Sequence, residues 1–263
     1  MFVIGERING MFKEVKKAIE ERDKEPIQSL ARRQLAAGAD ALDVNVGPTK
    51  GKAVDNMLWL IDTIQEVTDA PICVDTPKFD VMSAALKAAG NRTILNSTKA
   101  SSPELDRYIP LAVQTGSQLI ALTIDETGVP RDVDARVAMG ANIVTKAMEH
   151  GLELVDLYID PVILPVNVAP KQPKAVLGAI TQLKVISDPP PNFVIGLSNV
   201  SQSCKERELL NRIFLCMAIG VGLNAAIMDA LDTELMNAAI TAEVLLEKQL
   251  YCDDYIAAYL SNR

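Results

Sequence analysis

Short runs of apolar residues alternate with longer amphipathic stretches along the whole chain. Eight runs are nearly continuous in apolar residues, as expected of strands that are buried on both faces. Their centres lie about 21 to 40 residues apart, which leaves room for a crossover helix between each pair of parallel strands. The pattern therefore predicts strands at residues 2–5, 41–46, 71–75, 93–96, 118–123, 157–160, 193–197 and 225–228.

Eight repeats of strand and helix predict a (β/α)8 TIM barrel that forms one domain over residues 1–263. The alternative is a doubly wound parallel sheet. That fold is typically marked by a GxGxxG segment after the first strand, whereas this chain has GERING at residues 5–10. Residues 251–263 lie beyond the eighth predicted helix, and we expect one more helix there.

Composition and charge exclude several classes of function. The chain has 26 basic and 34 acidic residues, a formal charge of −8, and binding to nucleic acid or to an anionic membrane needs a basic face. No apolar run approaches the roughly 18 residues of a membrane-spanning helix. The first ten residues, MFVIGERING, lack the pattern of a signal peptide. We therefore expect a cytoplasmic protein without a nucleic-acid or membrane partner.

The residue types that usually bind metals are scarce or badly spaced. None of the 4 cysteines forms a CxxC pair, and His150 is the sole histidine, so zinc sites with several histidines are excluded. We predict His150 at a helix end, on the face of the barrel opposite the active site. Clustered aspartates can bind a divalent cation, but here asparagines accompany them and the aspartates at the strand ends show no DxD-type spacing that supports such a site. We predict no metal.

Polar side chains gather where the predicted strands end. Active sites of (β/α)8 barrels are built from the carboxyl ends of the strands, and nearly every strand here delivers an Asp or Asn to that rim. The competing interpretation is that these residues cap the following helices. Asp75, however, is followed by its own capping candidate, Thr76, and Asp160 precedes a proline-rich loop that begins no obvious helix. For Asn199, both the active-site interpretation and the helix-cap interpretation remain open, because a helix is predicted after Ser201.

A rim that is rich in Asp and Asn and poor in Lys and His suits a particular class of ligand. Carboxylates and amides recognise a planar heterocycle that carries several N–H donors and ring-nitrogen acceptors. A carboxylate can accept two parallel N–H bonds from an amidine-like edge. Phosphate binding would instead favour glycine-rich loops with Lys or Arg.

Six motifs at these strand ends occur in a familiar order: GERING, LDVNVGP, CVDT, ILNST, LYIDPVILP and GLSNVSQ. With them the chain resembles, over essentially its whole length, the methyltetrahydrofolate:corrinoid/iron–sulfur protein methyltransferases of the acetyl-CoA pathway. It is more distantly similar to the folate domain of cobalamin-dependent methionine synthase and to dihydropteroate synthase. Dihydropteroate synthases carry a lysine on the seventh strand, and FVIGLSN has none, so we favour methyl transfer.

The resemblance implies a role for each of ten side chains. Asp75, Asn96 and Asp160 would hold the pterin ring, and Asn199 would act near its N5 atom. The side chains expected near the ligand are those of Asp43, Ser198, Gln202 and Arg207. Glu6 and Asn9, in the first motif, would support the site.

The resemblance also implies the reaction and the partners. The N5 methyl group of methyltetrahydrofolate would pass directly to Co(I) of a corrinoid. That corrinoid, a cobalamin, would be bound on the corrinoid/iron–sulfur protein and not on this chain, which would work as a homodimer. A dihydropteroate synthase-like enzyme and a non-catalytic folate-binding protein are the alternatives. Methyl transfer to a reduced corrinoid distinguishes them.

Overall fold

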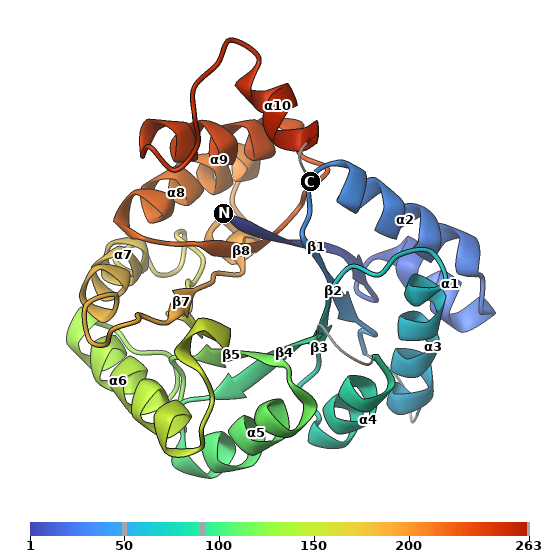
Figure 1. Cartoon of the computed structure of the whole chain (residues 1–263), viewed down its shortest axis with the longest axis horizontal. Helices are drawn as coiled ribbons and strands as arrows, with labels where there is room; N and C mark the ends of the chain where they lie inside the picture. The colour runs from blue at the N-terminus through green and yellow to red at the C-terminus, as the bar shows by residue number, and fades with distance from the viewer. Residues whose placement is uncertain (49–51, 90–92, 262–263) are drawn as a thin grey trace.

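The computed structural model describes residues 1–48, 52–89 and 93–261. Eight parallel strands form its centre, in the order β7-β6-β5-β4-β3-β2-β1-β8, and helices surround them (Figure 1). The strands are β1 (Phe2–Asn9), β2 (Ala41–Asn45), β3 (Ile72–Asp75), β4 (Thr93–Lys99), β5 (Gln118–Leu122), β6 (Leu157–Asp160), β7 (Asn192–Phe193) and β8 (Ala225–Met228). The predicted (β/α)8 barrel is confirmed.

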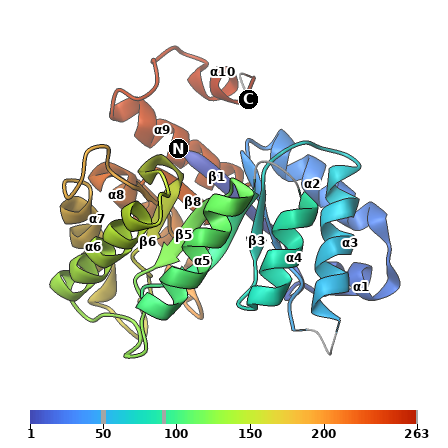
Figure 2. The same cartoon turned by 60° about the horizontal axis from the view of Figure 1, so that its bottom comes forward.

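Ten α-helices lie outside the strands in the described part of the chain. They are α1 (Lys13–Glu21), α2 (Lys24–Ala36), α3 (Ala53–Gln65), α4 (Phe79–Ala89), α5 (Ser102–Thr115), α6 (Val133–Glu149), α7 (Gln172–Leu183), α8 (Arg207–Val221), α9 (Thr233–Leu245) and α10 (Tyr255–Ser261). The expected additional helix at the end of the chain is α10, which lies against α9 (Figure 2). None of the described helices combines the length and the apolar character needed to cross a membrane.

Two apolar layers account for the arrangement. Inside the barrel, one buried residue from each strand or its continuation meets the others: Ile4, Ala41, Cys73, Ile94, Ile120, Tyr158, Val194 and Ala225. A larger cluster fills the space between the strands and the surrounding helices. The strands are thus buried on both faces, which explains their continuous apolar runs.

The first strand is longer than predicted. It runs to Asn9, four residues beyond the predicted end, and its pairing with β2 shifts between Gly5 and Ile8. Such a bulge places one extra residue in the strand and re-aims the side chains beside it. The polar residues Glu6 and Arg7 break the apolar pattern because they lie in this bulge and face the carboxyl end of the barrel.

The seventh strand is shorter than predicted, and this part of the prediction is wrong. Residues 193–197 do not form one strand, because β7 ends at Phe193 and a 3₁₀ helix, η2 (Leu197–Ser201), begins at Leu197. The barrel closes here through a single parallel bridge between Gly196 and Ile227. The apolar run remains buried although it is not a strand, so burial alone misled the prediction.

Candidate functional site

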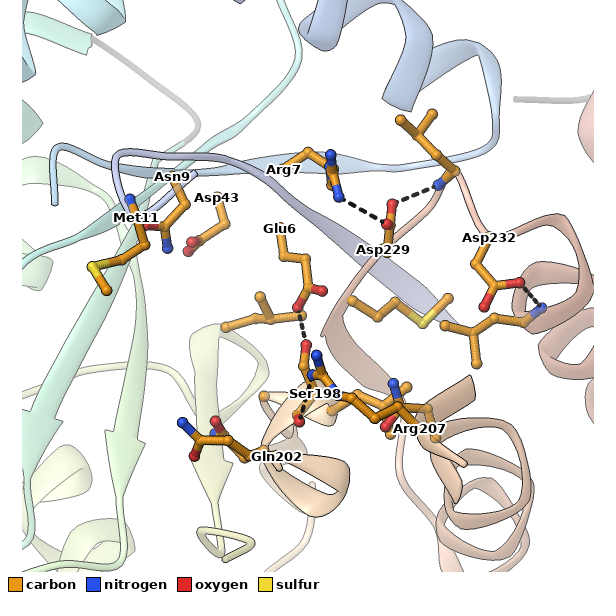
Figure 3. Close-up of a pocket in the computed structure, with 18 of the residues that line it drawn as sticks. Glu6, Arg7, Asn9, Met11, Asp43, Ser198, Gln202, Arg207, Asp229 and Asp232 are labelled. Atoms are coloured by element: carbon orange, nitrogen blue, oxygen red, sulfur yellow. Dashed lines mark hydrogen bonds and ion pairs between the residues drawn. The ribbon is translucent and has the colours of Figure 1, made fainter. Parts of the chain in front are cut away.

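A large cavity opens at the carboxyl ends of the strands. Its volume is about 1230 Å³, which is ample for a small organic ligand. All ten predicted site residues line it: Glu6, Asn9, Asp43, Asp75, Asn96, Asp160, Ser198, Asn199, Gln202 and Arg207. Figure 3 shows several of them converging from β1, β2 and the segment after β7. The parallel strands bring these residues together because their carboxyl ends share one edge.

Two hydrogen-bonded pairs of acid and amide groups lie at one wall of the cavity, one pair buried and the other part-buried. The Nδ2 of Asn96 donates to Oδ1 of Asp43 at 3.1 Å, and the Nδ2 of Asn45 donates to Oδ2 of Asp75 at 2.7 Å. These bonds hold one oxygen of each carboxyl group and fix its orientation. Asn45 is not among the predicted site residues, although its spacing of two from Asp43 places both on the same face of β2.

Burial controls the ionisation of these carboxyl groups. It raises the pKa of Asp43 well above its ordinary value, and the charge of Asp75 raises it further, while the Asn96 hydrogen bond lowers it. Burial likewise raises the pKa of Asp75, against the hydrogen bond from Asn45. A buried carboxylate is costly unless a partner satisfies it. The wall is therefore suited to a ligand that brings N–H donors.

Asp160 lies at the end of β6 and lines the same cavity. Its Oδ1 accepts the backbone N–H of Val162 at 2.7 Å. Burial raises the pKa of Asp160 to about 7, although the backbone N–H groups of Val162 and Gly196 and the charge of Arg136 lower it. The next α-helix begins only at Gln172, so Asp160 caps no helix.

The segment after β7 presents Ser198 and Asn199 to the cavity from η2. Helix α8 has Glu206 as its N-cap residue, so Asn199 does not cap it. In the described part of the chain the Asn199 amide has no hydrogen-bond partner. A Cβ atom on Gly196 would lie 3.0 Å from Nδ2 of Asn199, so glycine leaves room for this amide.

Glu6 and Arg207 flank the same turn from opposite sides (Figure 3). The hydroxyl of Ser198 donates to Oε2 of Glu6, and Arg207 donates to Oγ of Ser201 at 3.3 Å and to the carbonyl oxygen of Ser198 at 3.4 Å. Burial raises the pKa of Glu6, while the Ser198 hydrogen bond lowers it. These contacts brace the turn that carries Asn199.

His150 lies outside the cavity. His150 is the C-cap residue of α6, and its Nε2 lies 2.8 Å from Oδ1 of Asp106, away from the cavity. In the ranges that the structure describes, no group of three or more His, Cys, Asp or Glu side chains is arranged to hold a metal ion.

Sequence comparison gives the arrangement a context. Residues 9–229 match the model of the family described as "Pterin binding enzyme". The chain is 29% identical over 267 residues to the "Methylcorrinoid:tetrahydrofolate methyltransferase" of Eubacterium limosum, covering 100% of this chain and 97% of that protein. It is 28% identical over 244 residues to methionine synthase of Mycobacterium leprae, covering 88% of this chain but 20% of that protein.

Solved structures give the same fold. The dihydropteroate synthase of Clostridium difficile, crystallised in the presence of pteroic acid, superposes with a TM-score of 0.70 at 16% identity, over 93% of this chain and 96% of that one. The dihydropteroate synthase of Thermus thermophilus gives a TM-score of 0.67 at 20% identity, over 95% and 94% of the two chains. At such identities the likeness concerns the fold alone.

Proposed function

Because the chain belongs to the family of pterin binding enzymes, we propose that it is a methyltransferase that moves a methyl group between N5 of a folate and the cobalt of a corrinoid. The observation that carries this proposal is the cavity in which the side chains of Asp75, Asn96 and Asp160 face the same space as the amide of Asn199. The full-length likeness to a methylcorrinoid:tetrahydrofolate methyltransferase supports the choice of reaction.

In this proposal the acid and amide groups bind the pterin ring. Asp75 and Asp160 accept N–H groups of the ring, and Asn96, whose Nδ2 is engaged by Asp43, offers its amide oxygen. Four more side chains lie near the ligand: Asp43, Ser198, Gln202 and Arg207. Two others, Glu6 and Asn9, support the turn and the strand that carry the site residues. A ring that supplies several donors compensates the cost of burying these carboxylates.

The reaction breaks the bond between the methyl carbon and N5. The electron pair of Co(I) attacks the methyl carbon, the electron pair of the broken bond stays on N5, and N5 takes up one proton. A neutral amine nitrogen is a poor leaving group, so a hydrogen bond that strengthens as charge develops lowers the barrier. Asn199 can donate this bond because its amide is free of other partners among the described residues.

The proton must come from another group, since an amide does not titrate in this range. We propose that a network of water and carboxyl groups in the cavity, other than the Asp160 carboxylate that binds the ring, delivers the proton to N5.

We further propose methyltetrahydrofolate as the donor and a corrinoid/iron–sulfur protein as the partner, in the acetyl-CoA pathway. The sequence motifs support this choice. The relative from Eubacterium limosum is named for the opposite direction of transfer, and 97% of its length matches this chain. We also propose a homodimer, which sedimentation equilibrium tests directly.

Single-turnover methyl transfer tests the proposal. Methyltetrahydrofolate is first titrated into the protein by calorimetry, and Co(I) cobalamin is then added under anaerobic conditions while its absorption is followed. We expect saturable binding and then loss of the Co(I) absorption. Binding without transfer would favour a non-catalytic folate-binding protein. Condensation of a pterin with p-aminobenzoate would favour the dihydropteroate synthase alternative.

A further inference from the structure

A fully buried arginine lies behind the loop that follows β6. Arg136, in α6, has none of its surface exposed. Its Nε donates to the carbonyl oxygen of Pro161 at 2.7 Å, and its Nη2 donates to that of Val162 at 3.2 Å. Nη1 donates to the carbonyl oxygen of Asp132 at 3.3 Å, within its own helix end. The guanidinium fork thus joins α6 to the two residues that directly follow Asp160.

A second buried side chain holds the guanidinium in place. Nη2 of Arg136 also donates to Oε1 of Gln172, the first residue of α7. The amide of Gln172 in turn donates to the carbonyl oxygen of Pro130 at 3.2 Å, and Gln172 is itself buried. The guanidinium is therefore held by a bond to α7 as well as by its bonds to the loop after β6.

The loop held by Arg136 has an unusual backbone. Val162 has a φ of +57°, in the left-handed region, which a β-branched residue rarely adopts. In this conformation its N–H donates to Oδ1 of Asp160 at 2.7 Å. Such backbone persists where the surrounding structure holds it in place. Here the contacts of Arg136 to the carbonyl oxygens of Pro161 and Val162 do so.

We infer that Arg136 is a positioning residue for the Asp160 carboxyl group. By binding the carbonyl oxygens of residues 161 and 162, it keeps Val162 in the conformation that aims its N–H at Asp160, and so sets the direction in which Asp160 faces the cavity. The inference rests on the proposed function, in which Asp160 accepts an N–H group of the pterin ring. It assigns a role in ligand binding to a residue that touches no ligand.

The electrostatics agree with this geometry. The pKa of Asp160 is raised by burial to about 7, and three groups lower it: the N–H of Val162, the N–H of Gly196 and the charge of Arg136. Two of the three therefore depend on Arg136, one directly and one through the loop. Among the described residues, the charge of Arg136 acts on Asp160, and the charges of Asp132, at the start of α6, and of Asp160 act on Arg136.

The test uses the full-length protein and a readout that does not need the ligand. The pKa of Asp160 is measured by carboxyl ¹³C NMR, with the signal assigned by its loss in Asp160→Asn. The variants are Arg136→Met, Arg136→Lys, which keeps a positive charge and loses the fork, and each of these combined with Val162→Gly. The matched control is Ser117→Ala, which removes a buried hydroxyl at the opposite end of the barrel.

We expect Arg136→Met to raise the pKa of Asp160 by about one unit, which near pH 7 lowers the ionised fraction of Asp160, and with it methyltetrahydrofolate binding, by about fivefold. Arg136→Lys should change the pKa of Asp160 and the binding of methyltetrahydrofolate in the same direction, but by less than Arg136→Met. Val162→Gly should restore much of the binding in either background, because glycine adopts the left-handed conformation without a steric penalty. Ser117→Ala should leave both quantities unchanged.

An unchanged pKa of Asp160 in both arginine variants would overturn the inference, and so would the failure of Val162→Gly to restore any of the loss. If Arg136→Met does not fold, Arg136→Lys provides the same comparison. A wild-type protein that binds no methyltetrahydrofolate would refute the proposed function. The titration of Asp160 would still decide whether Arg136 controls that carboxyl group.

Discussion

The carboxyl group of Asp160 is buried and has few hydrogen-bond donors or positive charges near it. It lies at the end of a buried strand, and the groups that stabilise its charge are two backbone N–H groups and one arginine. These partners compensate only part of the cost of burying a charge, which is why its pKa remains above the ordinary value. The residue is thus poorly satisfied in the free protein and well prepared for a ligand with N–H donors.

Replacing Asp75 or Asp160 by alanine is expected to weaken folate binding and to leave the barrel folded. Each change removes an acceptor of charge-assisted hydrogen bonds, which are worth on the order of 1.5–3 kcal/mol apiece. Calorimetric titration with methyltetrahydrofolate measures the loss. Asp125→Ala is the control, because Asp125 follows β5 at the same end of the barrel but does not line the cavity. Normal binding by both variants, with normal melting, would refute the assignment of the pocket.

The free energy of unfolding should fall as the pH rises from about 4 to about 7. Asp160 has a raised pKa in the folded protein, about 7 against an ordinary value of 3.8, so the folded state binds more protons than the unfolded state over this interval. At about 1.4 kcal/mol per unit, this group alone accounts for up to about 4 kcal/mol. Urea unfolding at several pH values measures the slope, and Asp160→Asn should remove its share. An identical slope in that variant would contradict the assignment.

Among the elements, the turn η2 contributes most to the site. Ser198 and Asn199 face the cavity because β7 ends early and the chain turns at once. Gly196 bridges to Ile227 and leaves space for the Asn199 amide. The turn is braced by Glu6 of β1 and by Arg207 of α8. Together with β8, which contains Ile227, these elements set the position of Asn199.

Gly196→Ala is expected to lower the rate of methyl transfer while leaving the free energy of unfolding little changed. The added Cβ would lie 3.0 Å from Nδ2 of Asn199, so the amide must move by a few tenths of an ångström or more, and misplacement of a group in a preorganised site is costly for the rate. The comparison is with Gly220→Ala in α8, where the added Cβ meets nothing within 4 Å. Equal transfer rates in the two variants would show that Asn199 does not need this space.

The strand pattern was largely predictable, and the departures at β1 and β7 have physical reasons. Apolar runs mark segments that are buried on both faces, so all eight strands could be placed. They do not reveal the bulge in β1, which depends on pairing with β2. They also cannot separate a strand from a buried irregular segment, which is why residues 193–197 were assigned wrongly.

The candidate site was predictable where the residues lie at strand ends. Parallel strands bring these ends together, and all ten predicted side chains line the cavity. The residues that orient them were not predictable, because they act through contacts between distant elements. Asn45 binds Asp75 across two strands, and Arg136 reaches the loop after β6 from a neighbouring helix. The functional roles of the ten site residues and of the residues that orient them remain predictions.

At the scale of the whole molecule, the acidic and amide groups of the cavity lie at one end of the barrel, and the sole histidine lies away from them. His150 pairs with Asp106 on the outer helices α5 and α6. The cavity at the carboxyl ends of the strands is, in the proposed function, filled by the folate. In the same proposal, the methyl acceptor approaches this end of the barrel from outside, carried by its own protein.

The isolated protein is accordingly expected to purify without a stoichiometric corrinoid. His150 lies on the wrong side of the molecule to serve as a lower ligand of cobalt, and the cavity is assigned to the folate. An absorption spectrum of the purified protein, before and after incubation with cobalamin and gel filtration, measures this. A coloured corrinoid retained at one equivalent would contradict the assignment of the corrinoid to a partner.

The most direct test of the central claim is the single-turnover rate of methyl transfer in Asn199→Ala, measured by stopped flow with Co(I) cobalamin at saturating methyltetrahydrofolate. A hydrogen bond that strengthens in the transition state raises the rate of the chemical step more than it tightens substrate binding. We predict a rate lowered by about 10²–10³-fold, the usual cost of losing one preorganised donor, with a smaller change in folate affinity. A saturated rate close to that of the wild type would contradict the account.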